Sequence, residues 1–412
     1  MAQILNEPVT LPSGLVLPNR LFKAAMAENM ADSTGLPGSR LFEAYDQWSE
    51  GGWGALLTGN VDVDVNHMGS ARDMVVKSFN GDEDLTSWKK LATISQKNGT
   101  QTMAQINHPG RQSAPGAGNR GFWGKTIAPS AIPLDLGSGI IANAVRAFAF
   151  GTPREMTVSE IETVVQQFAG TAKVMESSGF AGVELHGAHG YLLAQFLSPS
   201  SNKRNDAYGG TPEKRAKIVV DIIKEIRKSV SAPFAVGIKL NSVDHQDSAD
   251  MEATLSQIRL IVEAGVDFLE ISGGTYEDPK MIGQSAPQQS SRTAAREAFF
   301  LDFAHEIRKH FPKLVLMVTG GFRTRAGMEA AISNGSCDLI GIARPAAINP
   351  KVPKLILDKD VPAEEVNLHL NKLQAPFLLR VLGVRLLTAG AETVYYAQQI
   401  QRMGKKLLPI AP

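Results

Sequence analysis

Short apolar segments alternate with amphipathic segments along most of the chain. The apolar segments are rich in Val, Ile and Leu and are continuously hydrophobic, as are strands of a parallel sheet that is buried on both faces. The segments between them repeat their apolar residues at helical spacing. The pattern predicts eight strands, at residues 20–27, 54–63, 101–107, 181–185, 234–240, 268–272, 314–318 and 338–343.

Helices are expected between these strands, and two of their starts carry clear signals. Thr157 and Glu160 form a capping box, and Thr211 precedes a proline at the first helical position. Eight strand–helix units predict an α/β fold, a closed (β/α)8 TIM barrel, over residues 1–350. Residues 351–412 are predicted to form a C-terminal helical extension. Further helices are expected at residues 40–49, 84–98, 250–264, 294–310, 325–334 and 391–403.

A long Gly- and Pro-rich interval, residues 108–153, follows the third predicted strand. A loop of this length inside a compact domain is usually a lid or a binding element. Its aromatic side chains could cover a ligand, or they could pack the loop against the body of the protein. These side chains are Phe122, Trp123, Phe148 and Phe150.

Composition narrows the class of protein. Hydrophobic residues make up 43% of the 412 positions and charged residues 20%, and the net charge is +1, so nothing favours nucleic acid or an anionic membrane. The single cysteine, Cys337, excludes an intrachain disulfide and an all-cysteine iron–sulfur cluster. Residues 1–20 lack the apolar run of a signal peptide, and no apolar run is long enough to span a bilayer. We therefore expect a cytoplasmic enzyme that acts on small molecules.

Candidate chemistry lies at the carboxyl ends of the strands, where TIM barrels place their active sites. Gly320 and Gly321 would let a ligand approach the backbone closely, and Ala343 and Arg344 add backbone donors and one positive charge. A phosphate site after strands seven and eight recurs in this fold. The alternative is that the glycines only form a tight turn.

Gln105 and Lys239 are placed for a polar heterocycle, because Gln105 offers both a donor and an acceptor. Lys239 lies within an apolar strand, where a lysine rarely stays buried without a partner. That partner could instead be a barrel carboxylate such as Glu184.

The stretch 182–210 carries the densest chemistry. His186 and His189 follow a strand end, with Tyr191 two residues on, at the start of a predicted short helix. Both imidazoles could point at one spot and hold an oxygen that becomes negative during a reaction. Two ordinary loop histidines, or a zinc site, remain alternatives at this spacing.

Several motifs together resemble the Old Yellow Enzyme family of flavin-dependent ene-reductases over residues 5–350. They are Pro18-Asn19-Arg20, residues 105–111 (QINHPGR), 153–157 (PREMT), 186–210 (HGAHGYLLAQFLSPSSNKRNDAYGG) and 320–324. The resemblance implies FMN across the barrel mouth, no metal, and NAD(P)H as reductant in a ping-pong scheme. No Gly-x-Gly-x-x-Gly motif follows a predicted strand, so a separate nicotinamide domain is not expected.

The resemblance also implies roles for individual residues. His186 and His189 would hold the carbonyl oxygen of the substrate, and Tyr191 would protonate Cα after the flavin N5 hydride reaches Cβ. Tyr276 would contact the substrate. The cofactor would be held by Ala25, Met26, Ala27, Gly59, Gln105, His186, Lys239, Gly320, Gly321, Ala343 and Arg344.

Three features depart from the family pattern. Ala27 stands where many members carry Cys or Thr, and Lys239 where many carry Arg, so the charge survives without the planar fork. The tail after Lys351 is longer than in compact members. Its Tyr395 and Tyr396 could reach a neighbouring mouth in a homodimer, or the tail could pack on its own barrel. A phosphate- or metal-dependent lyase or isomerase, and a flavin-binding sensor without turnover, are the competing functions.

Overall fold

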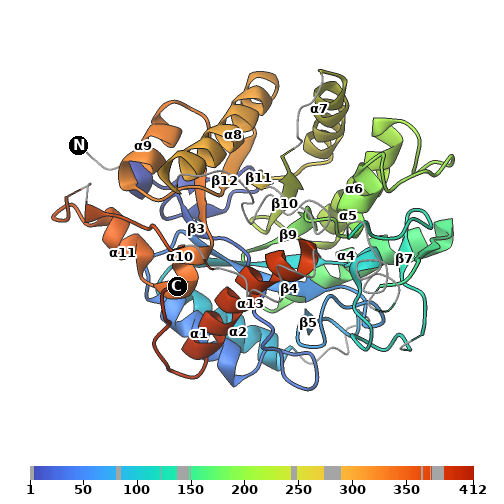
Figure 1. Ribbon diagram of the computed structural model, residues 1–412, viewed down its shortest axis with the longest axis horizontal. Helices are drawn as coiled ribbons and strands as arrows, with labels where there is room; N and C mark the ends of the chain where they lie inside the picture. The colour runs from blue at the N-terminus through green and yellow to red at the C-terminus, as the bar shows by residue number, and fades with distance from the viewer. Residues whose placement is uncertain are drawn as a thin grey trace.

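Parallel strands close into a barrel at the centre of the molecule (Figure 1). The computed structural model describes residues 4–79, 85–121, 123–136, 148, 150–242, 248–272, 289–362, 365–371, 373 and 385–412. Within them, the main sheet has nine strands, and pairing of β3 with β4 closes eight into a ring and leaves β5 (Met74–Val75) outside. The ring consists of β3 (Leu21–Lys23), β4 (Ala55–Asp62), β6 (Gln101–Asn107), β9 (Gly182–Gly187), β10 (Ala235–Asn241), β11 (Phe268–Ser272), β12 (Val315–Thr319) and β13 (Leu339–Ile342). The predicted TIM barrel is confirmed.

Helices surround the barrel, as the spacing of apolar residues predicts. The two helix starts predicted from the sequence, at Thr157 and Thr211, are confirmed. Thr157 accepts from the Glu160 backbone N–H in a complete capping box, and Thr211 accepts from the Lys214 N–H. The surrounding helices are α1 (Ser39–Ser49), α2 (Thr86–Gln96), α4 (Val158–Ser177), α6 (Pro212–Ser229), α7 (Ser248–Glu263), α8 (Gln289–His310) and α9 (Arg325–Ser333).

The first barrel strand is shorter than predicted. β3 ends at Lys23, and Ala24–Ala27 continue as a loop that runs to the mouth of the barrel. A short hairpin of β1 (Val9–Thr10) and β2 (Val16–Leu17), which the sequence pattern did not reveal, adds Leu11, Leu15 and Leu17 to an apolar cluster with the inward side chains of the barrel strands.

Side chains alternate between the inside and the outside of the barrel along each strand. Those inside form an apolar cluster that includes Ala235 and Phe268, which we call the apolar plug, and a polar layer with Lys239 and Glu270, which we call the floor. In β10, Ala235 belongs to the apolar plug, Gly237 makes room for the ring of Phe268, and Lys239 follows two residues later on the same face. A Cβ at Gly237 would lie 2.1 Å from a ring atom of Phe268. Register then pairs Lys239 with Glu270 on one side and His186 on the other. The strand pattern therefore brings charged groups together just below the mouth.

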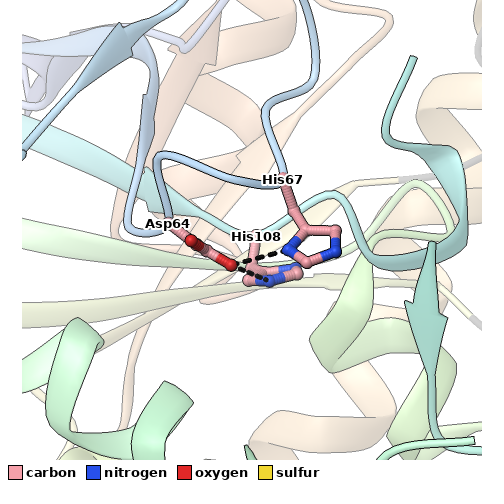
Figure 2. A group of neighbouring side chains, drawn as sticks. All are labelled: Asp64, His67 and His108. Carbon is pink, nitrogen blue, oxygen red and sulfur yellow. Dashed lines mark hydrogen bonds and ion pairs between the residues drawn. The ribbon is translucent and has the colours of Figure 1, made fainter. Parts of the chain in front are cut away.

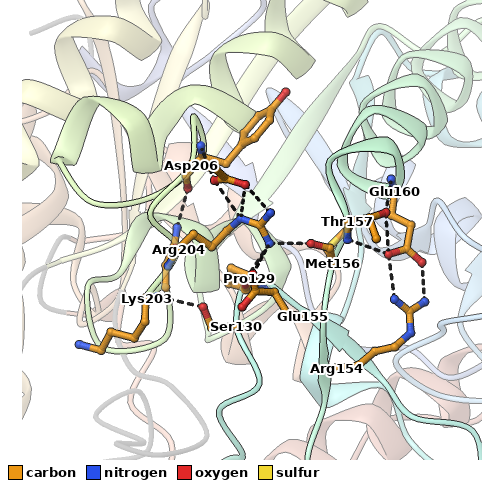
Figure 3. Close-up of polar contacts among 12 residues, drawn as sticks. Pro129, Ser130, Arg154, Glu155, Met156, Thr157, Glu160, Lys203, Arg204 and Asp206 are labelled. Atoms are coloured by element: carbon orange, nitrogen blue, oxygen red, sulfur yellow. Dashed lines mark hydrogen bonds and ion pairs between the residues drawn. The ribbon is translucent and has the colours of Figure 1, made fainter.

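The long loop after β6 is fastened to the stretch 202–210 by one arginine (Figure 3). The buried Arg204 guanidinium donates to the carbonyl oxygens of Pro129, at 3.0 Å, and Met156, at 2.6 Å, and it pairs with Asp206 at 2.5 Å. The two ends of the loop also pair as β7 (Ile127–Ala128) and β8 (Arg154–Glu155). This clamp holds the loop beside the helix that follows the histidine pair.

The loop aromatics are not lid residues in the described structure. Trp123 and Phe148 are 83% and 74% exposed, and neither they nor Phe150 line the cavity at the barrel mouth. Phe122 lies outside the described residues.

The C-terminal extension contains α11 (Val352–Leu357) and α13 (Arg385–Met403). α13 packs against α10 (Arg344–Ile348) and α1 of the same chain and crosses in front of the barrel (Figure 1). The domain boundary at residue 350, the homodimer and the cytoplasmic location stay predictions. None of the described helices is long and apolar enough to cross a membrane.

We predict that Arg204→Ala lowers the free energy of unfolding by about 3 kcal/mol, because two buried carbonyl oxygens and Asp206 lose their partner. Urea unfolding followed by circular dichroism measures this change. Arg154→Ala is the matched control. Its ion pair with Glu160 is partly exposed, so its loss should change stability by less than about 1 kcal/mol. Equal effects of the two substitutions would contradict the clamp.

Candidate active site

A cavity of about 230 Å³ opens at the carboxyl ends of the barrel strands. Residues of the loop after β3 and the ends of seven further strands surround it, and α13 contributes one wall. Eleven residues that the sequence assigns to the site line this cavity, namely Ala25, Met26, Ala27, Gln105, His186, His189, Tyr191, Lys239, Gly320, Ala343 and Arg344.

Three assigned residues are not among those that line the cavity. Gly59 supports the cavity from behind: its N–H donates to the Glu28 carboxylate at 3.1 Å, and a Cβ there would lie 2.6 Å from the Met26 carbonyl oxygen. Gly321 is buried beside Gly320 with φ of +90°. Tyr276 lies outside the described residues.

The structure adds residues that sequence reasoning did not select. Three of them lie at strand ends, namely Asn60, Ser272 and Thr319. Their positions could have marked them as site residues, but their side-chain chemistry is not distinctive. Phe300 comes from α8, and nothing in the local sequence marks it. Four more lining residues come from α13, which are Glu392, Thr393, Tyr396 and Ala397.

The histidine pair forms one wall of the cavity. His186 ends β9, and His189 reaches back through a positive φ of +58°. The His189 Nδ1 and His186 Nε2 atoms are 3.2 Å apart, so one ring donates to the other. The Tyr191 ring meets His186 edge-on, with centroids 4.7 Å apart. The two imidazoles therefore lie together, as predicted, and Tyr191 lies beside them at the same cavity.

Both histidines are held neutral. Burial lowers the pKa of His186 well below its ordinary value, and the charges of His189 and Lys239 act in the same direction. Burial lowers the pKa of His189 equally clearly, with Lys239 adding to the effect. Neutral imidazoles at this wall can donate hydrogen bonds without carrying charge.

Paired charges make up the floor beneath the cavity. Lys239 Nζ lies 2.9 Å from Glu270 Oε1, and Gln105 Nε2 donates to Glu184 Oε2 at 2.6 Å. Burial raises the pKa of Glu184 well above its usual range, and the neighbouring Glu270 raises it further. A raised pKa favours the protonated form of Glu184. The partner of Lys239 is Glu270 rather than the Glu184 considered from sequence.

A second group of ionisable side chains, Asp64, His67 and His108, lies beside the site (Figure 2). Asp64 Oδ2 is 2.7 Å from His67 Nδ1 and 3.6 Å from His108 Nε2. Burial opposes ionisation of Asp64, but the neighbouring His108 and His67 outweigh it and hold the pKa of this carboxyl well below its usual range.

The position of the ring proton on His108 decides whether this group suits a metal ion or a hydrogen-bonded cluster. The Gly110 N–H donates to His108 Nδ1 at 3.0 Å, so the ring proton lies on Nε2 and faces Asp64. A metal ion needs the lone pair on Nε2, which would place a second proton against Gly110. Within this group, which we call the hub, His67 is hydrogen-bonded to Asp64, whereas His108 Nε2 lies beyond hydrogen-bond distance of Asp64 and has no other partner among the described residues.

One side of the cavity fits an anionic group, and we call Thr319, Gly320, Ala343 and Arg344 the phosphate corner. Gly320 has φ of +135°, and a Cβ there would lie 2.8 Å from the Phe300 ring. The buried Thr319 Oγ1 has no hydrogen-bond partner among the described residues. Arg344 supplies a guanidinium, which pairs with Glu392 at 2.7 Å. A free donor, a charged donor and an open backbone are what a phosphate requires.

Comparison with known proteins shows the family and the fold of this chain. Residues 5–360 match the NADH:flavin oxidoreductase / NADH oxidase family. The NADH-dependent flavin oxidoreductase iliE of Neonectria sp. (strain DH2) is 48% identical over 96% of this chain, which spans 54% of that relative. The protein of the same name from Hypocrea jecorina (strain QM6a) is 45% identical over 94% of this chain and 97% of its own. Morphinone reductase superimposes with a TM-score of 0.70 at 22% identity, over 86% of this chain and 90% of its own, which shows a shared fold.

The chain therefore belongs to the NADH:flavin oxidoreductase / NADH oxidase family, and the Old Yellow Enzyme resemblance is confirmed. It is an NAD(P)H-dependent oxidoreductase with FMN as its cofactor. The non-redox lyase or isomerase considered from sequence is thereby set aside. The roles of the individual site residues stay predictions.

We predict that Arg344→Ala raises the dissociation constant of FMN by roughly 30-fold, because a charge-assisted hydrogen bond to phosphate is lost. Flavin fluorescence quenching, with riboflavin titrated in parallel, measures the effect. Riboflavin lacks the phosphate and should bind both proteins alike. Arg402, which is half-buried and donates to the Leu408 carbonyl oxygen, provides the control substitution Arg402→Ala. Unchanged FMN binding by Arg344→Ala would remove Arg344 from the phosphate corner.

Proposed function

We propose that this family member reduces activated C=C bonds of α,β-unsaturated carbonyl compounds. The observation that supports this proposal most directly is the wall made of two neutral histidines and a tyrosine above a charged floor. Bound FMN would supply the hydride that it takes from NAD(P)H. The chain's own residues bind the carbonyl oxygen and deliver the proton.

His186 and His189 bind the carbonyl oxygen of the substrate. When hydride reaches Cβ, negative charge develops on this oxygen. Donors that are already in place stabilise that charge more in the transition state than in the ground state. In the described structure the Ala188 N–H donates to His186 Nδ1, so His186 donates through Nε2 to His189 Nδ1. This bond between the rings must open before both N–H groups can donate to the substrate oxygen.

Tyr191 delivers the proton to Cα. A phenol is a donor at neutral pH, and the Tyr191 ring lines the cavity while resting edge-on against His186. His186 thus contacts both His189, the second histidine at the carbonyl oxygen, and Tyr191, the proton donor. Lys239, on the floor, faces the region where the resemblance expects the flavin ring.

Stopped-flow measurement of the two half-reactions tests Tyr191. Tyr191→Phe should slow reoxidation of the reduced enzyme by cyclohexenone by roughly 10²–10⁴-fold, the usual effect of a lost general acid. Reduction by NADH needs no proton from Tyr191 and should keep its rate. Equal slowing of both half-reactions, or of neither, would show that Tyr191 is not the proton donor.

The histidines are tested by phenol binding, because a phenolate mimics the developing oxyanion. His189→Ala should weaken p-hydroxybenzaldehyde binding and slow reoxidation by cyclohexenone by roughly 10²–10³-fold. Tyr191→Phe is the matched control, since it leaves the two imidazoles in place and should keep the phenol affinity. Normal phenol binding by His186→Ala and His189→Ala would place the oxygen elsewhere.

A further inference from the structure

The C-terminal helix α13 forms a wall of the active-site cavity although it lies beyond the residues that the family model matches, 5–360. Glu392, Thr393, Tyr396 and Ala397 line the cavity. Their spacing places them on one face of the helix. A segment outside the shared family region therefore contributes side chains to the site.

α13 lies over the barrel (Figure 1), and contacts at two points fasten it there. In the first half of the helix, Glu392 Oε1 accepts from Arg344 at 2.7 Å. Toward its end, Gln401 Nε2 donates to the Glu28 carbonyl oxygen at 3.1 Å, in the loop that carries Ala27. The helix is thus tied both to the phosphate corner and to the loop on which the resemblance places the flavin ring.

Tyr396 carries a hydroxyl group for which the described residues provide no acceptor. Its side chain is only 4% exposed, and the hydroxyl has no hydrogen-bond partner among the described residues. A buried donor without an acceptor is destabilising and rare in native structures. Burial raises the pKa of Tyr396 to about 12, with Arg344 opposing the shift, so the phenol stays neutral and able to donate.

The charge balance of the phosphate corner explains the need for such a donor. Glu392 already pairs with Arg344, so the guanidinium does not offer its full charge to an incoming anion. A phosphate has more acceptor positions than this shared guanidinium can fill, and neutral hydroxyl groups can supply the remaining hydrogen bonds. Arg344 and Glu392 are among the groups whose charges act on Tyr396, with Arg323 and Tyr395, so its side chain lies in their neighbourhood.

We infer that Tyr396 donates a hydrogen bond to the phosphate of bound FMN, so that the C-terminal helix completes the phosphate corner from the same chain. The inference rests on the assignment of that corner and not on the identity of the substrate. It makes α13 a cofactor-binding element in addition to any role it has at a subunit interface.

Flavin binding by the full-length protein tests this inference. Tyr396→Phe should raise the dissociation constant of FMN by about 10- to 100-fold, since a hydrogen bond to a charged group is lost, and should leave riboflavin binding unchanged. The adjacent Tyr395 gives a matched control. Its hydroxyl donates to the Ile410 carbonyl oxygen at 2.8 Å, so Tyr395→Phe should leave the affinity for both flavins as in the unmodified protein.

Other outcomes contradict the inference in distinguishable ways. Equal weakening of FMN and riboflavin by Tyr396→Phe would place the hydroxyl at the ring or ribityl chain. Unchanged FMN binding with altered phenol binding would make Tyr396 a substrate residue. If Arg344→Ala also failed to separate FMN from riboflavin, the phosphate corner itself would be wrong, while the proposed ene-reductase chemistry would stand.

Discussion

The ion pair between Lys239 and Glu270 is the interaction on which the site depends. Both side chains are inside the barrel, and Glu270 is fully buried. Removing two charges from water is unfavourable unless they meet each other or find further hydrogen bonds. The register of β10 against β11 makes the meeting unavoidable, because the two residues are direct partners. The pair therefore holds the Lys239 ammonium group at the floor of the cavity, opposite a buried carboxylate.

The neutral state of the histidines follows partly from this floor. Burial disfavours protonation of His186 and His189, and the fixed charge of Lys239 disfavours it further. Protonated imidazoles would repel Lys239 and would bind anions from solution. Neutral ones keep the cavity available to a carbonyl oxygen, which acquires its charge only during the reaction. Lys239 thus both pairs with Glu270 on the floor of the cavity and lowers the pKa of the two histidines that form its wall.

Much of this arrangement could be predicted from the sequence. The period of the apolar segments gives the barrel, and the barrel places strand ends together, which brings His186, Lys239 and Arg344 into one cavity. The partner of Lys239 could not be chosen, since Glu184 and Glu270 are both inward on neighbouring strands and only register separates them. Gly59 was expected at the cofactor from the family resemblance. Its N–H donates to Glu28, and its contact with the cofactor stays a prediction.

The contribution of α13 was beyond sequence reasoning. Its residues follow the barrel in the chain with no strand to place them, so where the helix packs depends on contacts between distant segments. The Gln401 side chain bonding to the Glu28 carbonyl oxygen is one such contact, across more than three hundred residues. The hub of Asp64, His67 and His108 is similar, since its three residues come from two separate strand ends.

Anaerobic titration of the purified protein at the flavin absorption band tests the central claim most directly. The account predicts a yellow protein whose flavin band is bleached by NADH or NADPH and restored by one equivalent of cyclohexenone. A colourless protein that takes up no FMN would contradict the cavity as a flavin site. A bleached protein that oxygen reoxidises but cyclohexenone does not would contradict the reduction of activated C=C bonds.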